Sequence, residues 1–156
     1  MLSDLKNGLI VSCQPVPGGP LDSPAIVAAF ARAAEAGGAQ GLRIEGLANL
    51  RAVRMVTSLP IIGLIKRIDP ATPVIITARS DDVSDLAEAG ADIVAFDATR
   101  RQGRLASVAS LADAARSAGC LSMADSATFA DAEAAVEAGA DIVGTTLSGY
   151  TGGPVP

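Results

Sequence analysis

A repeated segment constrains the fold of this chain more than any other sequence feature. EAGADIV occurs at 88–94 and at 137–143, and a looser copy, EAGGAQGLRI, occupies 35–44. In each copy an Ala- and Glu-rich stretch predicts a helix, and the Gly after it fits a left-handed helix C-cap. A short β-branched stretch then predicts a strand. The identical copies lie 49 residues apart, which is room for two strand–helix units of about 25 residues each.

Strand and helix patterns alternate along the whole chain, which predicts an α/β fold with a parallel sheet. We expect six strands, at about 8–13, 41–44, 60–66, 92–97, 121–125 and 141–146. We expect five helices, near 23–36, 47–57, 81–89, 105–118 and 128–138. The segment TPVIIT, 72–77, is expected to form a short extra strand or hairpin. Without a linker or low-complexity tract, residues 1–156 are expected to form one domain.

Six strands and five helices amount to three quarters of a (β/α)8 barrel, the TIM-barrel fold, which typically has about 250 residues. This sequence has 156 residues, and only LSGYTGGPVP follows the core of the sixth strand. We therefore expect a barrel that is incomplete at its C-terminus. Because an open sheet leaves exposed edges, the alternatives are a truncated piece, a different closure, or a partner that covers the gap.

Composition excludes several classes of function. The chain contains no His, which removes His-based zinc sites and Ser-His or Cys-His catalysis. Cys13 and Cys120 have neither metal-ligand nor disulfide spacing, so Cys13 is expected to be a packed strand residue. A net charge of -5 without any basic run argues against nucleic-acid binding. No apolar stretch reaches about 18 residues and no convincing signal peptide is present, so we expect no membrane span and a cytoplasmic protein.

Polar residues stand at the expected carboxyl ends of five consecutive strands. They are Gln14, Arg43, Lys66, Asp97 and Asp125. Parallel strands bring these ends to one rim of a barrel, where active sites lie, and side chains alternate between the two faces of each strand. We therefore expect a shared site that contains a lysine and carboxylates. The alternative for each residue is a solvated loop position, and for Asp97 it is a cap of its own loop.

Two further residues are candidates for the same site. Glu45 lies on the same face of its strand as Arg43, and Thr146 ends the sixth strand. Arg67 follows Lys66 and points to the opposite face, so we expect it to be structural or solvated.

Six blocks of the sequence together resemble the N-acetylmannosamine-6-phosphate 2-epimerase family. They are LIVSCQPVPGGPLD (9–22), LRIEGLANLRAVR (42–54), PIIGLIKR (60–67), AGADIVAFDAT (89–99), MADSAT (123–128) and GADIVGTTLSGYT (139–151). The resemblance implies a (β/α)8 barrel of the phosphosugar-binding group, without cofactor or metal. It implies an isomerase, often dimeric, that interconverts N-acetylmannosamine 6-phosphate and N-acetylglucosamine 6-phosphate in sialic acid catabolism.

The resemblance also implies roles for individual residues. Lys66 resembles the family's catalytic base, and Gln14, Arg43 and Asp125 resemble its substrate contacts. The family uses a further glutamate after strand seven and phosphate-binding loops after strands seven and eight, which this sequence does not reach. We expect burial of Lys66 and the nearby Arg43 to favour a neutral amine, with Asp125 opposing this. The 156-residue chain alone is expected to be weakly active or inactive.

Two other interpretations of the sequence stay open. One is a different phosphate-binding barrel, such as those of thiamin phosphate synthesis or ribulose-phosphate epimerisation, although the latter enzymes use metal-binding histidines. The other is a catalytically incomplete fragment that only binds a sugar phosphate or a partner chain.

Overall fold

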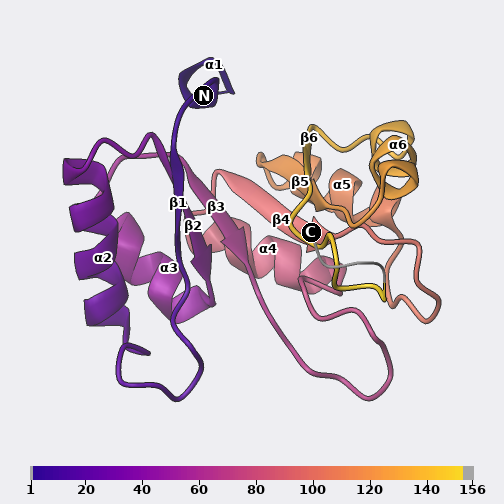
Figure 1. The fold of residues 1–156 in the computed structure, drawn as a ribbon, viewed down its shortest axis with the longest axis horizontal. Helices are drawn as coiled ribbons and strands as arrows, with labels where there is room; N and C mark the ends of the chain where they lie inside the picture. The colour runs from indigo at the N-terminus through magenta and orange to yellow at the C-terminus, as the bar shows by residue number, and fades with distance from the viewer. Residues whose placement is uncertain (1, 153–156) are drawn as a thin grey trace.

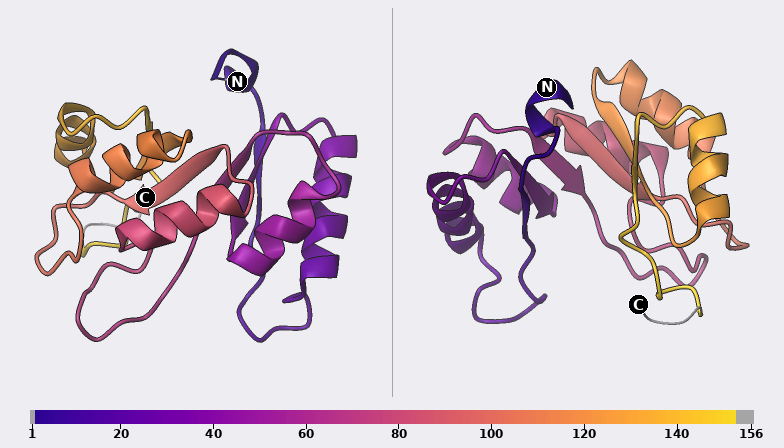
Figure 2. Two further views of the ribbon diagram at one scale, coloured as in Figure 1. Left: turned by 180° about the vertical axis from the view of Figure 1, so that it is seen from behind. Right: turned by 45° about the horizontal axis from the view of Figure 1, so that its top comes forward.

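Six parallel strands form one curled sheet in the computed structural model, which describes residues 2–152 (Figure 1). The strand order follows the sequence from β1 to β6. The strands are β1 (Ile10–Cys13), β2 (Gly41–Glu45), β3 (Ile61–Leu64), β4 (Ile93–Asp97), β5 (Leu121–Asp125) and β6 (Ile142–Gly144). The helices are α1 (Leu2–Leu5), α2 (Pro24–Ala36), α3 (Leu47–Arg54), α4 (Ser80–Glu88), α5 (Val108–Ser117) and α6 (Phe129–Glu137). Helices α2 to α6 lie along the outer side of the curl, which gives a partial barrel (Figure 2).

The six strands and five helices predicted from the sequence are all present, with ends that differ by a few residues. The short helix α1 was not predicted. The prediction of a strand over 60–66 was wrong at its end, because β3 stops at Leu64. Beyond that point Ile65 bonds to Thr77 of the loop: the N–H of Thr77 donates to the Ile65 carbonyl over 2.8 Å, and the N–H of Ile65 donates to Thr77 Oγ1 over 3.2 Å. Lys66 and Ile76 form an antiparallel bridge, which confirms a hairpin over the segment around 72–77.

Alternation along the strands separates two apolar layers. Side chains on the outer face pack against the helices and include Leu42, Ile44 and Phe96, all fully buried. Side chains on the inner face form a smaller cluster around Ile62 and Ile93. Because both faces are covered, the central strand β3 is buried along its whole length. The inner cluster fills the inside of the partial barrel below the carboxyl ends of the strands, where polar side chains lie instead.

The repeated segment has the same structure in both copies. Gly90 and Gly139 follow α4 and α6 with φ of 103° and 91°, a left-handed conformation that only Gly adopts readily. The N–H of the next residue then donates to a carbonyl in the last helical turn, as from Ala91 to Leu86 over 3.0 Å. The predicted left-handed C-caps are therefore confirmed.

The Asp of each repeat connects neighbouring strands. Asp92 Oδ2 accepts from the N–H of Ile61, at the start of β3, over 2.9 Å. Asp141 Oδ2 accepts from the N–H and the hydroxyl of Ser122, in β5, over 2.9 and 2.7 Å. Each carboxylate thus satisfies a backbone group at the amino end of the preceding strand and fixes the register of the pair.

Gly63 sits where β3 passes under two helices, and we expect its replacement by Ala to destabilise the fold. An added Cβ would lie 2.9 Å from the Cβ of Ala91 and 3.2 Å from Cδ2 of Leu86, in a fully packed core. Overpacking of this kind costs about 1–3 kcal/mol of unfolding free energy, measured by urea denaturation. Ser117→Ala, at an exposed helix end, is the control and should change stability by less than about 0.5 kcal/mol. Equal stability of Gly63→Ala and the parent chain would contradict this packing.

The Asp141 carboxylate makes stability depend on acidity. Burial would raise its pKa, but the hydrogen bonds from Ser122 and the charge of Arg116 lower it below the ordinary Asp value. The contribution is thus fully present above the unfolded-state pKa of about 3.9 and is lost as pH falls through the lower folded value. We expect Asp141→Asn to be less stable than the parent at pH 7, with the gap closing below about pH 4. Urea titrations at several pH values test this, and a gap that stays constant down to pH 2 would contradict it.

Candidate active site

A cavity of about 530 Å³ lies at the carboxyl ends of the strands. The long loops after β1 and β3 leave the sheet at this end (Figure 1). Polar and apolar side chains from β1 through the segment after β6 line it. They are Ser12, Gln14, Arg43, Lys66, Ile75, Ile76, Asp97, Arg101, Thr146, Leu147 and Tyr150. The volume is that of a small-molecule site. Four of the five predicted strand-end residues therefore meet in one space.

The fifth residue, Asp125, does not line this cavity and instead forms a buried ion pair with Arg43. Arg43 Nη1 and Nη2 donate to the two carboxylate oxygens over 3.1 and 2.6 Å. The Asp125 side chain is 0% exposed and that of Arg43 is 11% exposed. Arg43 Nε is buried without a hydrogen-bond partner. The guanidinium is thus held flat by a two-point contact at the cavity wall, with its charge compensated from below.

Lys66 stands at the edge of the cavity, and the prediction that it is buried was wrong. Its side chain is exposed, because the chain leaves the sheet after Leu64 and turns into the hairpin. Its backbone N–H lies 3.4 Å from Glu45 Oε1, a long hydrogen bond. Glu45 itself does not line the cavity. Among the described residues, no carboxylate forms an ion pair with the Lys66 amine, so the amine is available to a ligand.

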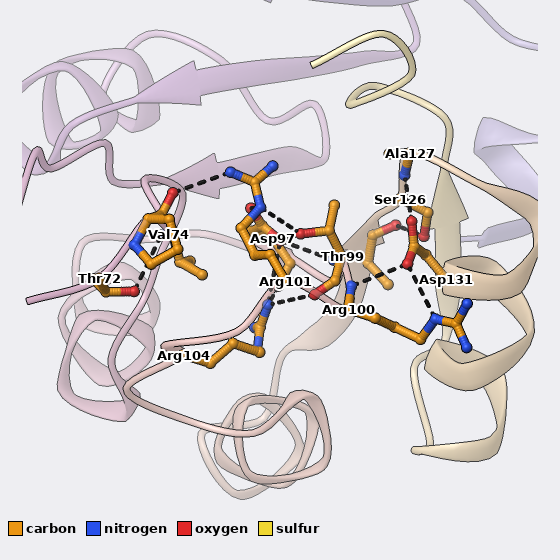
Figure 3. Close-up of polar contacts among 12 residues, drawn as sticks. Thr72, Val74, Asp97, Thr99, Arg100, Arg101, Arg104, Ser126, Ala127 and Asp131 are labelled. Carbon is orange, nitrogen blue, oxygen red and sulfur yellow. Dashed lines mark hydrogen bonds and ion pairs between the residues drawn. The ribbon is translucent and has the colours of Figure 1, made fainter. Parts of the chain in front are cut away.

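Asp97 organises the loop that follows β4 (Figure 3). Its Oδ1 accepts from the N–H and the hydroxyl of Thr99 over 2.8 and 2.6 Å, and from Arg104 Nη1 over 3.2 Å. Burial lowers the pKa of the Arg104 guanidinium, although the Asp97 charge opposes this. Asp97 therefore caps its own loop and also lines the cavity, so its two interpretations do not exclude each other.

Arg101 lines the cavity and was missed by the sequence analysis. It lies in the loop after β4, where RRQGR contains three arginines. A loop has no side-chain periodicity, so the sequence does not indicate which of the three reaches the cavity. Tyr150, after β6, also lines the cavity and was also missed. Gln14 and Thr146 line the cavity as predicted, and Gln14 Nε2 donates to Ser12 Oγ over 2.7 Å.

Several other side chains are excluded from the chemistry. Burial raises the pKa of the Cys13 thiol, which confirms that residue as a packed strand position. Arg67 forms an ion pair with Asp82 over 2.6 Å, in line with the structural role predicted for it. Over residues 2–152, no group of three or more His, Cys, Asp or Glu side chains could hold a metal ion. Within the same range, every helix is too short or too polar to cross a membrane.

Comparisons with known proteins agree with this arrangement. A family model described as "Putative N-acetylmannosamine-6-phosphate epimerase" matches residues 27–156. The chain belongs to this family. A "Putative N-acetylmannosamine-6-phosphate 2-epimerase" from Yersinia pseudotuberculosis serotype O:1b (strain IP 31758) is 57% identical over 152 residues. That alignment covers 97% of this chain and 65% of the relative, so the chain spans about two thirds of the length of the relatives it matches.

Solved structures give the same family and the same fold. The N-acetylmannosamine-6-phosphate 2-epimerase from Clostridium perfringens superposes with a TM-score of 0.93 at 40% identity, over 97% of this chain and 66% of that one. A phosphonomutase from Burkholderia cenocepacia J2315, described as putative, superposes with a TM-score of 0.57 at 19% identity, over 87% and 68%. The latter shows a shared fold alone. The predicted partial (β/α)8 barrel of this epimerase family is therefore confirmed.

The Arg43–Asp125 ion pair predicts a large asymmetry between single and double replacement. Asp125→Ala leaves a nearly buried guanidinium uncompensated, which should cost about 3–5 kcal/mol of unfolding free energy. Replacing both residues, as Arg43→Met with Asp125→Leu, removes both buried charges and should cost much less. Urea denaturation measures both variants. A double variant that loses as much stability as Asp125→Ala would contradict this account.

Proposed function

We propose that this chain carries the epimerase chemistry of its family, the interconversion of N-acetylmannosamine 6-phosphate and N-acetylglucosamine 6-phosphate. The observation that carries the proposal is the convergence of Lys66, Arg43 and Gln14 on one cavity at the barrel rim. The cavity is large enough for an amino sugar phosphate, and family membership supplies the substrate class.

The reaction at carbon 2 is proton transfer. In the open-chain sugar this carbon lies beside the aldehyde, so removal of its proton gives an enolate. Return of a proton to the opposite face inverts the centre, and no electrons are exchanged with a redox partner. The site must supply a base and a donor for the enolate oxygen.

Lys66 is the base in this proposal, because its amine reaches the cavity and has no ion-pair partner among the described residues. Arg43 faces the cavity beside β3 with its guanidinium fixed by Asp125, so it can donate to a substrate oxygen without reorganising. Gln14, anchored on Ser12, adds a polar contact from β1. Thr146, after β6, also lines the cavity and offers a hydroxyl.

The described part of the chain lacks an evident acid that could return a proton to the second face of carbon 2. Asp97 is the one carboxylate among the described lining residues, but its side chain is only 3% exposed and its Oδ1 already accepts hydrogen bonds from Thr99 and Arg104. We therefore infer that proton exchange from the Lys66 face is faster than epimerisation in this chain. The substrate is a sugar phosphate, and we further propose a cytoplasmic protein that assembles as a homodimer.

The test follows carbon 2 by proton NMR in deuterated buffer. With N-acetylmannosamine 6-phosphate as substrate, we expect the chain to incorporate deuterium at carbon 2 faster than it forms the gluco epimer. Lys66→Met should slow this exchange by about 10²- to 10⁴-fold, the usual contribution of a positioned base.

Lys6 provides the matched control, because it is the chain's other lysine and lies exposed after α1, away from the lining residues. Lys6→Met should exchange at the parent rate. Exchange by Lys66→Met at the parent rate would overturn the role of Lys66. Absence of both exchange and conversion in the parent chain would overturn the proposed function for this chain.

A further inference from the structure

We propose that Arg101 is a substrate-binding residue, which donates from Nη2 to an oxygen of the open-chain sugar phosphate in the cavity. The inference rests on the proposed function and adds a residue that neither the sequence pattern nor the resemblance assigned. It depends on three features of Arg101: how it is held, which of its donors is free, and how its charge is balanced.

Two protein acceptors fix the Arg101 guanidinium (Figure 3). Its Nε donates to Thr99 Oγ1 over 2.8 Å, and Thr99 in turn donates to Asp97 over 2.6 Å. Its Nη1 donates to the carbonyl of Pro73, in the hairpin after β3, over 3.1 Å. These bonds hold the planar group in one orientation, so little rotamer entropy remains to be lost when a ligand binds.

One nitrogen of this fixed group is left over for a ligand. Nη2 has no hydrogen-bond partner in the described part of the chain, and the side chain is 24% exposed where it lines the cavity. A guanidinium has five N–H groups in a fixed fork, and two of its three nitrogens are used here. The geometry therefore offers Nη2 to whatever occupies the cavity.

The local charge balance favours an electron-rich ligand oxygen. Asp97 is one carboxylate between two arginines, with Arg104 Nη1 at 3.2 Å and Arg101 Nε at 3.7 Å. Arg104 is held more closely, because Nη2 of Arg104 also donates to the Asp97 carbonyl over 2.6 Å. Arg101 is thus only partly compensated, whereas Arg43 is fully paired with Asp125. Charge-assisted hydrogen bonds to phosphate, enolate or carbonyl oxygens are the contacts such a group makes best.

The neighbouring Arg100 provides a natural contrast in the same loop. Its side chain turns to the other side of the loop, towards Asp131 in α6, with Nε 3.7 Å from Oδ1 (Figure 3). It is 66% exposed and does not line the cavity. Removing the charge of Arg100 therefore controls for the net charge of the loop without touching the proposed contact.

The bond to Pro73 creates a second route by which Arg101 could matter. The hairpin supplies Ile75 and Ile76 to the cavity, so loss of this bond could disturb binding indirectly. Asp69→Asn separates the two routes. It weakens the ion pair between Asp69 and Arg79 in the same loop and leaves every contact of Arg101 in place.

Isothermal titration of the 156-residue chain with N-acetylmannosamine 6-phosphate tests the proposal. We expect Arg101→Gln to raise the dissociation constant by about 10- to 100-fold, as for loss of a hydrogen bond from a charged donor. Arg100→Gln and Asp69→Asn should stay within about twofold of the parent. Parallel titrations with unphosphorylated N-acetylmannosamine identify the oxygen. An equal loss of affinity for both sugars in Arg101→Gln would show that Nη2 contacts an oxygen of the sugar portion. A loss of affinity for the phosphorylated sugar alone would show that Nη2 contacts the phosphate.

Three results would overturn the inference, and they are distinguishable from one another. Parent-like affinity in Arg101→Gln would show that Nη2 has no ligand. A loss in Asp69→Asn equal to that in Arg101→Gln would show that Arg101 acts only through the hairpin. Failure of the parent chain to bind the sugar phosphate would overturn the proposed function, and this inference with it.

A second variant covers the case in which Arg101→Gln does not fold. Arg101→Lys keeps the charge, but one ammonium cannot reproduce the fork that serves Thr99, Pro73 and a ligand together. We expect about a tenfold weaker affinity for the sugar phosphate in this variant. Unchanged affinity in a folded Arg101→Lys would also overturn the inference.

Discussion

The contact between Arg43 and Asp125 can form only if the sheet curls. These residues lie in β2 and β5, which are separated by two intervening strands. Strands in a sheet are about 4.8 Å apart, so a flat sheet would hold the two backbones about 14 Å apart, beyond the combined reach of the side chains. The observed bond of 2.6 Å thus belongs to a sheet bent towards closure. The same curvature brings the strand ends around one cavity.

This pairing also determines which charges the cavity presents. Asp125 neutralises Arg43 from below, and Asp97 is taken up mainly by Arg104 and Thr99. Neither carboxylate is left to compensate Lys66. The inner wall of an acidic protein, with a net charge of -5, therefore offers cationic donors to its ligand. Such a site suits the proposed reaction, in which the enolate of a phosphorylated sugar is stabilised during proton transfer.

Sequence reasoning succeeded where local rules and tertiary packing agree. Gly90 and Gly139 were predicted as helix C-caps because the left-handed conformation is a local property, and both adopt it. Strand-end parity placed Arg43 and Asp97 at one cavity, because alternation holds in any strand. The burial of Lys66 was predicted wrongly, since the apolar run suggested a strand as far as 66. The chain instead pairs with its own hairpin after Leu64, and no local pattern encodes that departure.

The sequence by itself determined the order of the elements, the two faces of each strand and the family, because these depend on residue type and spacing along the chain. Only the tertiary structure decided which charged groups pair and which stay free. Arg100 and Arg101 are adjacent and chemically identical, yet one lies against Asp131 and the other faces the cavity. Part of the difference comes from Pro73, whose carbonyl reaches Arg101 only once the hairpin has folded beside β4. Such non-local contacts cannot be read from spacing.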